Sequence, residues 1–426
     1  MVFAANTAHS QFLMDMLDTT KELGRSNRDM LMRFDHIRIS GYMQPQYQVA
    51  SAKGVKNYSG GDFAQQSDNR FMLRRGRIRF DYARMNKDQR NQLQFVFQFD
   101  GTERGVFIRD FWGRVWENKL HLFAFTTGMF ARPFGFEVNY SSGVREAPER
   151  GRMSQILVKT ERDIGFMIST ESQKQKTFAS KFRIDAGFFN GQGLTSPVDY
   201  DSYKDFISQL VWKPTLISKN LYASGGVSVL YGGIAQFADV TYRISDKAGQ
   251  MDFIADSVST IKGDKLPRHY YGANMQLKYI TSWGGTELRG EFWKGTQTAT
   301  QYNSETPGTI PVDNTGKPQP FYIRPFSGGF VTFLQNIVNK KHQVAVKYDW
   351  YDPNTVVSGK GVGNNNSFTQ ADILYRTLGV GYIYYMSENF KIVLWYDRVE
   401  NEGSSVPGYE KDIDDNILTC RLQFTF

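Results

Sequence analysis

The chain lacks the long apolar runs that identify transmembrane helices. No segment of its 426 residues approaches the about 20 consecutive apolar residues that such a helix needs, and the mean hydropathy is −0.46. Cysteine is almost absent as well, because Cys420 is the single one, which excludes an intramolecular disulfide framework and a multi-cysteine metal site. If this chain spans a membrane, it must do so with strands.

Histidine is also scarce. The five histidines lie in unrelated segments and show no metal-ligand spacing: His9, His36, His121, His269 and His342. A hydrolytic enzyme would need a serine or threonine nucleophile beside a histidine base, and the sequence indicates no such constellation. We therefore expect no metal, no cofactor and no enzymatic activity.

Aromatic residues are abundant, with 33 phenylalanines and 23 tyrosines. They recur with period two, as in L-Q-F-V-F-Q-F-D (Leu93–Asp100), where one strand face is apolar and the other polar. About sixteen such segments follow one another: 36–48, 70–83, 91–100, 105–115, 119–130, 162–171, 180–190, 203–213, 220–231, 268–280, 285–297, 322–336, 341–352, 370–386, 389–401 and 414–426. An even number of this size fits an antiparallel barrel wide enough for an aqueous channel.

The connections between these segments alternate in length. Every second one is short: 84–90, 116–118, 172–179, 213–219, 281–284, 337–340 and 387–388. The others are mostly long and polar, with extremes at 131–161, 232–267 and 298–321. Transmembrane barrels have short periplasmic turns and long extracellular loops. The sequence thus predicts an all-β, transmembrane antiparallel β-barrel over residues 36–426, located in the outer membrane of a Gram-negative bacterium and surrounded by its lipid and lipopolysaccharide. Residues 1–35 are expected to be an N-terminal periplasmic segment, helical or mobile, with a possible signal-peptide remnant.

One strand is crowded with arginine, in the stretch F-M-L-R-R-G-R-I-R-F-D-Y (Phe71–Tyr82). Arg75, Arg77 and Arg79 share one face, whereas Ile78 and Phe80 share the other. An arginine cluster often indicates nucleic-acid binding, but an apolar opposite face suits lipid, so we expect no nucleic-acid partner and place the arginines in the lumen. Arg74 falls on the outward face and should lie near a membrane interface or at a β-bulge.

Several motifs resemble the phosphate-selective porin O/P family. R-R-G-R-I-R-F-D resembles that family's R-R-A-R-x-x-F strand, T-G-M-F-A-R-P-F-G-F-E (Thr127–Glu137) its G-x-F-K-x-P-F-G-x-E, and E-R-G-R-M (Glu149–Met153) its E-R-S. The likeness continues through F-F-N-G-Q-G (Phe188–Gly193), G-E-F-W-K-G (Gly290–Gly295), V-K-Y-D-W-Y-D (Val346–Asp352) and the terminal R-L-Q-F-T-F, in the family's order. Two departures are Gly76 in place of the alanine and Ala131 in place of the lysine, with an arginine displaced to Arg132.

The resemblance implies a homotrimeric outer-membrane porin with an inward-folded third loop, lined by basic residues that pass small inorganic anions such as phosphate. The candidate anion-binding residues lie on the inward strand faces and in the connection 131–161: Arg38, Arg75, Arg77, Arg79, Arg132, Arg145, Arg150 and Arg152. Arginine suits this role because its planar guanidinium stays charged and matches phosphate oxygens.

Two alternatives stay open. The lumen arginines could instead pair with lumen acids such as Asp81, Asp100 or Asp110 and brace the barrel wall. The whole chain could also be a structural or accessory barrel with a blocked pore, holding outer-membrane protein partners in a larger complex.

Overall fold

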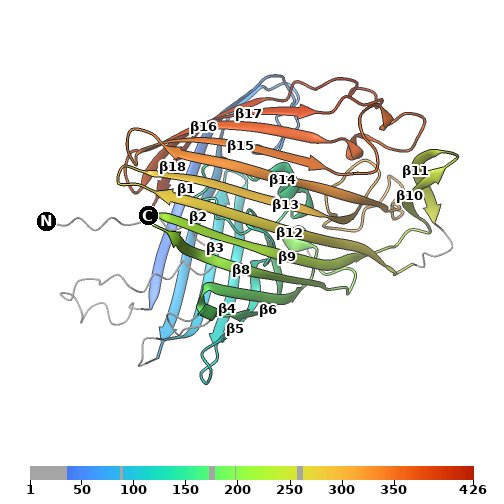
Figure 1. Ribbon diagram of the computed structural model, residues 1–426. Coiled ribbons are helices and arrows are strands. Elements are labelled where there is room, and N and C mark those ends of the chain that lie inside the picture. Colours follow the sequence, from blue (N-terminus) through green and yellow to red (C-terminus); the bar gives the residue numbers. More distant parts are fainter. Residues whose placement is uncertain (1–35, 87–89, 172–177, 197, 257–261) are drawn as a thin grey trace.

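The computed structural model describes residues 36–426 apart from 87–89, 172–177, 197 and 257–261, and nearly all of its regular structure is β-strand (Figure 1). The expected N-terminal segment 1–35 lies outside the described residues. The strands are β1 (Ile37–Ala50), β2 (Asn69–Met85), β3 (Asn91–Thr102), β4 (Gly105–Trp116), β5 (Phe123–Ala131), β6 (Arg162–Thr170), β7 (Phe182–Phe189), β8 (Asp205–Ser218), β9 (Leu221–Ala235), β10 (Thr241–Lys247), β11 (Gln250–Asp256), β12 (Lys265–Ile280), β13 (Gly285–Ala299), β14 (Tyr322–Asn336), β15 (His342–Asp352), β16 (Tyr375–Tyr385), β17 (Phe390–Asn401) and β18 (Ile417–Thr425). The helical segments are short: α2 (Arg152–Leu157), η1 (Phe178–Lys181), η2 (Gly193–Thr195), η3 (Gly359–Gly361) and η4 (Gln370–Asp372).

Sixteen of these strands form one closed barrel. From β1 to β9 each strand pairs antiparallel with the next, β9 pairs directly with β12, and the series continues to β18. β18 then pairs with β1, where Cys420 lies opposite Tyr47. The predicted antiparallel sixteen-stranded barrel is confirmed, and its closure leaves no open edge in the wall.

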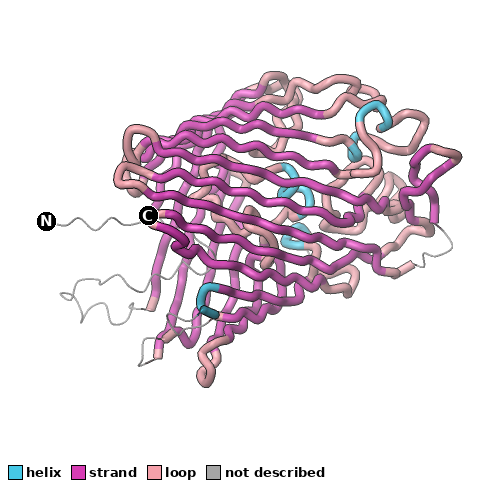
Figure 2. Tube along the Cα trace, viewed as in Figure 1, coloured by secondary structure: helices cyan, strands magenta, loops and turns pink. Residues whose placement is uncertain are grey.

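The barrel wall has an apolar outer face and a polar inner face (Figure 2 shows the continuous strands). In β2, for example, Ile78 and Phe80 are exposed whereas Arg77 and Arg79 are buried. Exposed apolar side chains occur in the same way around the wall: Phe95, Phe125, Phe166, Ile184, Val227, Phe292, Val331 and Leu394. This belt suits bilayer hydrocarbon, and an even-stranded antiparallel barrel of this kind is the outer-membrane type, so the protein is located in the outer membrane.

No helix among the described residues is long and apolar enough to cross a membrane.

The connections differ at the two ends of the barrel. Short turns gather at the end that holds the C-terminus, such as 219–220 between β8 and β9 and 281–284 between β12 and β13 (Figure 1). The long connections gather at the opposite end, including 132–161, 300–321 and 353–374. The end with short turns therefore faces the periplasm, as the sequence predicted.

A hairpin formed by β10 and β11 projects beyond the outer end of the barrel (Figure 1). The predicted plain connection 232–267 is wrong, because β9 and β12 extend into it and the hairpin fills its middle. Each hairpin strand has only seven residues and mixes charged with apolar side chains, so its period-two signal is weak. β10 also pairs in parallel with the start of β14.

The buried ion pair between Arg324 and Asp372 stabilises the outer loops. Arg324 Nε lies 2.8 Å from Asp372 Oδ1, and both side chains are fully buried. The Arg324 guanidinium also donates to the carbonyls of Thr300 and Gln301, 2.9 Å away in each case. Arg324 of β14 therefore joins two long outer connections.

Replacing this arginine, as in Arg324→Met, is expected to destabilise the outer loops by about 3–5 kcal/mol, because Asp372 would remain buried without its partner. Limited proteolysis of the folded barrel would reveal this as faster cleavage within 353–374. The matched control is Arg398→Met, because the Arg398–Glu400 pair is exposed and should contribute about 0–1 kcal/mol. Equal cleavage rates in the two variants would contradict the assigned role of Arg324.

Candidate functional site: the inward loop and its arginines

Residues 132–161, named here the inward loop, fold into the lumen after β5. Phe134 is fully buried and packs edge-on against Trp293 of β13, with ring centroids 4.8 Å apart. Phe134 and the α2 residue Ile156 belong to a buried apolar cluster that also contains Leu230 of β9. The inward loop thus fills one side of the lumen with apolar packing, which agrees with the inward-folded third loop that the resemblance implied.

Charged groups of the barrel wall hold the inward loop in place. The Glu291 carboxylate of β13 accepts hydrogen bonds from the backbone N–H groups of Phe136 (2.6 Å) and Glu137 (2.9 Å). Lys347 of β15 forms an ion pair with Glu137. Further along the loop, Glu146 accepts from Arg289 Nη1 at 2.9 Å. These contacts fix the loop on several strands at once.

The motif P-F-G-F-E depends on its glycine. Gly135 has φ +70°, and a Cβ atom there would lie 2.5 Å from Glu291 Oε1 and 2.8 Å from Trp293 Cζ2. Only glycine fits both the left-handed backbone and this close approach. The motif is therefore the tight turn by which the loop docks on β13.

A β-bulge in β2 explains the position of Arg74. Between the pairs Met43–Gly76 and Pro45–Leu73, two residues of β2 oppose one residue of β1. Arg74 and Arg75 consequently both reach the inner side, where each bonds Glu149 of the inward loop. Of the two positions that the sequence left open for Arg74, the structure shows the bulge.

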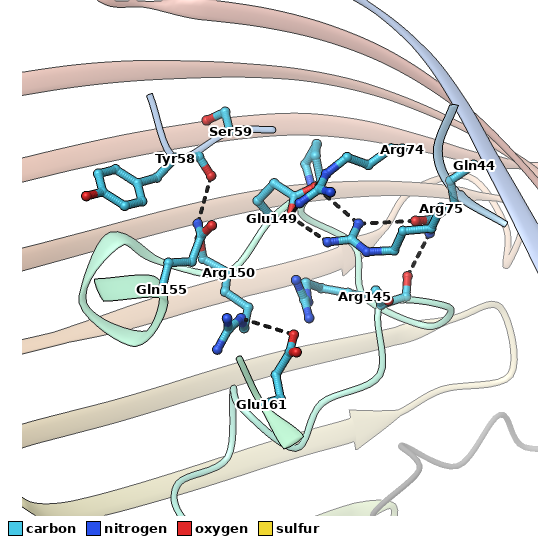
Figure 3. Close-up of polar contacts among 12 residues, drawn as sticks. Gln44, Tyr58, Ser59, Arg74, Arg75, Arg145, Glu149, Arg150, Gln155 and Glu161 are labelled. Carbon is cyan, nitrogen blue, oxygen red and sulfur yellow. Dashed lines mark hydrogen bonds and ion pairs between the residues drawn. The ribbon is translucent and has the colours of Figure 1, made fainter. Parts of the chain in front are cut away.

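Three arginines surround Glu149 (Figure 3 shows two of them). Its carboxylate lies 2.8 Å from Arg74 Nε, 2.6 Å from Arg75 Nη2 and 2.9 Å from Arg421 Nη2 of β18. Burial alone would raise the pKa of Glu149, but the three arginines hold that pKa well below its usual range. Glu149 is therefore ionised at neutral pH and links the inward loop to β2 and β18.

Arg145 is the fourth arginine of this group, and its charge is not matched by a bonded carboxylate. Its Nη2 donates to the carbonyl of Tyr140 (3.0 Å), whereas Nε and Nη1 are buried and have no hydrogen-bond partner within the described part of the chain. Burial, and then the neighbouring Arg75, lower the pKa of Arg145 to about 10, so it stays cationic at neutral pH. Figure 3 shows its guanidinium beside those of Arg75 and Arg150.

Arg74, Arg75, Arg145 and Arg421 together with Glu149 are named here the arginine cluster. Four cations face one carboxylate, so the cluster has an excess of positive charge.

The other two arginines of the β2 row are paired with acids of the wall. Arg77 Nε lies 3.0 Å from Asp100 Oδ2, and its Nη1 donates to Ser142 Oγ at 3.1 Å. Arg79 binds Asp81 through two hydrogen bonds of 2.7 Å. These contacts are those of the bracing alternative, and the role of the row in ion selectivity stays a prediction.

The remaining arginines of the loop have structural contacts. Arg132 donates to the carbonyls of Gly191 and Thr160. Arg150 lies 3.5 Å from Glu161 and also donates to carbonyls within the inward loop. Arg152 stacks on the ring of Tyr375 at 3.6 Å.

Two cavities border the arginine cluster, one at Glu149 and the other at Arg145. The outer one, of about 30 Å³, is lined by Glu149, Arg150 and Arg152 together with Asn57 of an outer connection. The periplasmic one, of about 260 Å³, is lined among others by Arg38, Arg77, Arg79, Arg145 and the C-terminal Phe426. The predicted residues are therefore divided between the two cavities rather than gathered at one point, and Arg75 and Arg132 line neither cavity.

Arg421 is the main residue that sequence reasoning missed. The alternation in the last strand places Arg421 on the inward face with Gln423, but nothing local relates it to Arg75. Closure of the barrel does, because β18 and β2 both pair with β1. The order of the strands around a closed barrel would have placed the first two strands next to the last one, and so Arg421 near Arg75.

The described residues contain no group of three or more histidine, cysteine, aspartate or glutamate side chains able to hold a metal ion.

Comparisons with known proteins give information on the fold alone. No family model and no curated protein sequence matches the chain. Among solved structures, the outer membrane channel DcaP of Acinetobacter baumannii is similar with a TM-score of 0.54 and 11% identity, over 92% of this chain and 97% of that one. A loop L8 deletion mutant of OmpT, an outer membrane protein of Vibrio cholerae, has a TM-score of 0.49 and 10% identity, over 92% and 99% of the two chains. The likeness to DcaP supports the outer-membrane barrel fold, and the resemblance to the phosphate-selective porin O/P family stays a prediction.

Proposed function

We propose that the protein is an outer-membrane porin whose aqueous channel prefers anions. The observation that carries this proposal is the arginine cluster, where four guanidinium groups face a single carboxylate between two cavities. Rings or ladders of arginine in a pore attract anions and repel cations. The homotrimer and the phosphate-like substrate that the resemblance implies belong to this same proposal.

The channel runs along the polar side of the lumen. Apolar packing around Phe134 and Ile156 fills another part of the lumen, and the same cluster reaches the periplasmic cavity at Trp112 and Val138. The inner faces of β1 and β18 are polar. Gln44 of β1 donates to Gln423, and Arg421 of β18 donates to Glu149 of the inward loop. Ions that cross the barrel therefore pass close to the arginine cluster, where partial exclusion of water strengthens electrostatic forces.

Arg145 gives the sharpest test of the anion preference. Because its guanidinium binds no carboxylate, the substitution Arg145→Gln removes a cation without leaving an acid unpaired. We expect the reversal potential of the purified protein, measured in planar bilayers across a KCl gradient, to shift toward zero, the value of an unselective pore. Block by added phosphate should weaken.

The matched control is Arg104→Gln, in the exposed turn between β3 and β4. This change removes the same charge from an exposed turn and should leave the reversal potential unchanged. If Arg145→Gln folds normally and retains the wild-type reversal potential, the cluster does not set the selectivity.

The alternative function, an accessory barrel with a blocked pore, also has an observation in its favour. Glu149 of the inward loop bonds to both β2 and β18, and the two cavities beside the arginine cluster are separate. A protein of this kind should be nearly silent in single-channel recordings. Conductance of the wild-type protein therefore decides between the two functions.

A further inference from the structure

The periplasmic cavity combines cations with aromatic rings, which a site for bare inorganic ions does not need. Tyr42 of β1, Trp112 of β4 and Tyr140 of the inward loop line the same cavity of about 260 Å³ as Arg77 and Arg145. The Arg77 guanidinium lies 5.7 Å from the centroid of the Tyr42 ring. This arrangement offers apolar ring surface directly beside positive charge.

The charge of the cavity favours anions. Five cationic side chains line it against three carboxylates: Arg38, Arg77, Arg79, Arg145 and Arg162 against Asp81, Asp110 and Glu161. Arg77, Arg79 and Arg162 are bound to carboxylates of the wall. Arg145 retains two buried N–H groups without a partner among the described residues, and buried donors of this kind are costly unless a ligand or water satisfies them.

An unpaired acceptor accompanies these donors. The side-chain oxygen of Asn139 is buried and has no hydrogen-bond partner in the described structure, although its amide nitrogen donates to the carbonyl of Gly135 at 3.0 Å. The cavity is smaller than the roughly 300–1,000 Å³ of sites for drug-sized ligands. Its size thus fits a single-ring compound rather than a larger ligand.

We propose that this cavity binds small aromatic carboxylates, with the carboxylate at Arg145 and the ring beside Tyr42 and Trp112. A carboxylate matches the planar guanidinium donors, and aromatic rings gain from stacking and from removal of apolar surface from water. The inference rests on the proposed anion channel and narrows its substrate class, because a bare phosphate would leave the ring surface unused.

Calorimetric titration of the detergent-solubilised protein with benzoate, acetate and inorganic phosphate tests the inference. We expect benzoate to bind roughly tenfold more tightly than acetate, since only benzoate has a ring to bury. Tyr42→Leu should reduce benzoate affinity and leave acetate affinity unchanged, whereas Arg145→Gln should weaken both. The matched control Tyr348→Leu changes an outward-facing tyrosine of β15 and should alter neither.

The two proposals fail in different ways. Equal affinities for benzoate and acetate, or benzoate binding that survives Tyr42→Leu, would overturn the aromatic site even if the channel is anion-selective. If benzoate binding depends on Tyr42 and Arg145 but the protein shows no conductance in bilayers, the aromatic site is supported and the proposed channel function is refuted. Because Tyr42→Leu also removes the hydrogen bond between Tyr42 and Ser142, Tyr42→Phe provides the second variant: it keeps the ring and should retain the preference for benzoate over acetate.

Discussion

Deletion of residues 138–147 is expected to raise single-channel conductance several-fold. This part of the inward loop includes Arg145 and Glu146, and its residues line the periplasmic cavity from Val138 to Arg145. Its removal widens the polar path and takes Val138 out of the apolar cluster, whereas Phe134 and Ile156 of that cluster remain. Conductance rises with the cross-section at the narrowest part of a pore, so the effect should be large if the inward loop forms that part.

The barrel itself should survive this deletion, because its wall is a continuous ring of antiparallel ladders. Heat-modifiable migration on unboiled gels checks that the variant has folded. Deleting 313–317, an exposed turn of an outer connection, serves as the control and should leave conductance unchanged. A folded 138–147 deletion with wild-type conductance would place the constriction elsewhere.

Glu149→Gln is expected to produce the largest gain in anion selectivity. The change removes the one carboxylate that bonds Arg74, Arg75 and Arg421, while glutamine keeps nearly the same size. The cluster then holds four cations and no bonded acid, so the local potential becomes more positive and cations are excluded more strongly. Reversal potentials across a KCl gradient should move further toward the chloride equilibrium value.

The loss of these ion pairs will also loosen the inward loop, since removing one partner of a buried pair is destabilising. Faster proteolysis within 132–161 should therefore accompany the change in selectivity. Glu400→Gln is the matched control, because Glu400 pairs with exposed Arg398 on the outer rim; it should affect neither measurement. A reversal potential that stays at the wild-type value in a folded Glu149→Gln variant would show that permeating ions do not meet the cluster.

The sequence by itself determined the strands and the face on which each side chain lies. Period-two alternation identified all sixteen barrel strands, and it assigned Arg77 and Arg79 to the inside and Ile78 and Phe80 to the outside. This succeeds because a strand has only two faces. Charged side chains are costly on the lipid face at mid-depth, so the face that carries them must be the inner one. The alternation of short and long connections predicted the orientation of the barrel in the membrane, because short turns face the periplasm and long loops face outside.

Only the tertiary structure decided what each inward arginine contacts. Arg75 and Arg421 are distant in sequence and meet at Glu149 because β1 lies between their strands in the closed ring. Arg74 turns inward through a bulge that strand periodicity cannot represent. Arg145 and Glu149 come from a loop whose path depends on apolar docking of Phe134 against Trp293. Residue types and spacing predict a face of the wall, whereas pairing across the lumen depends on barrel closure and loop packing, which no local pattern encodes.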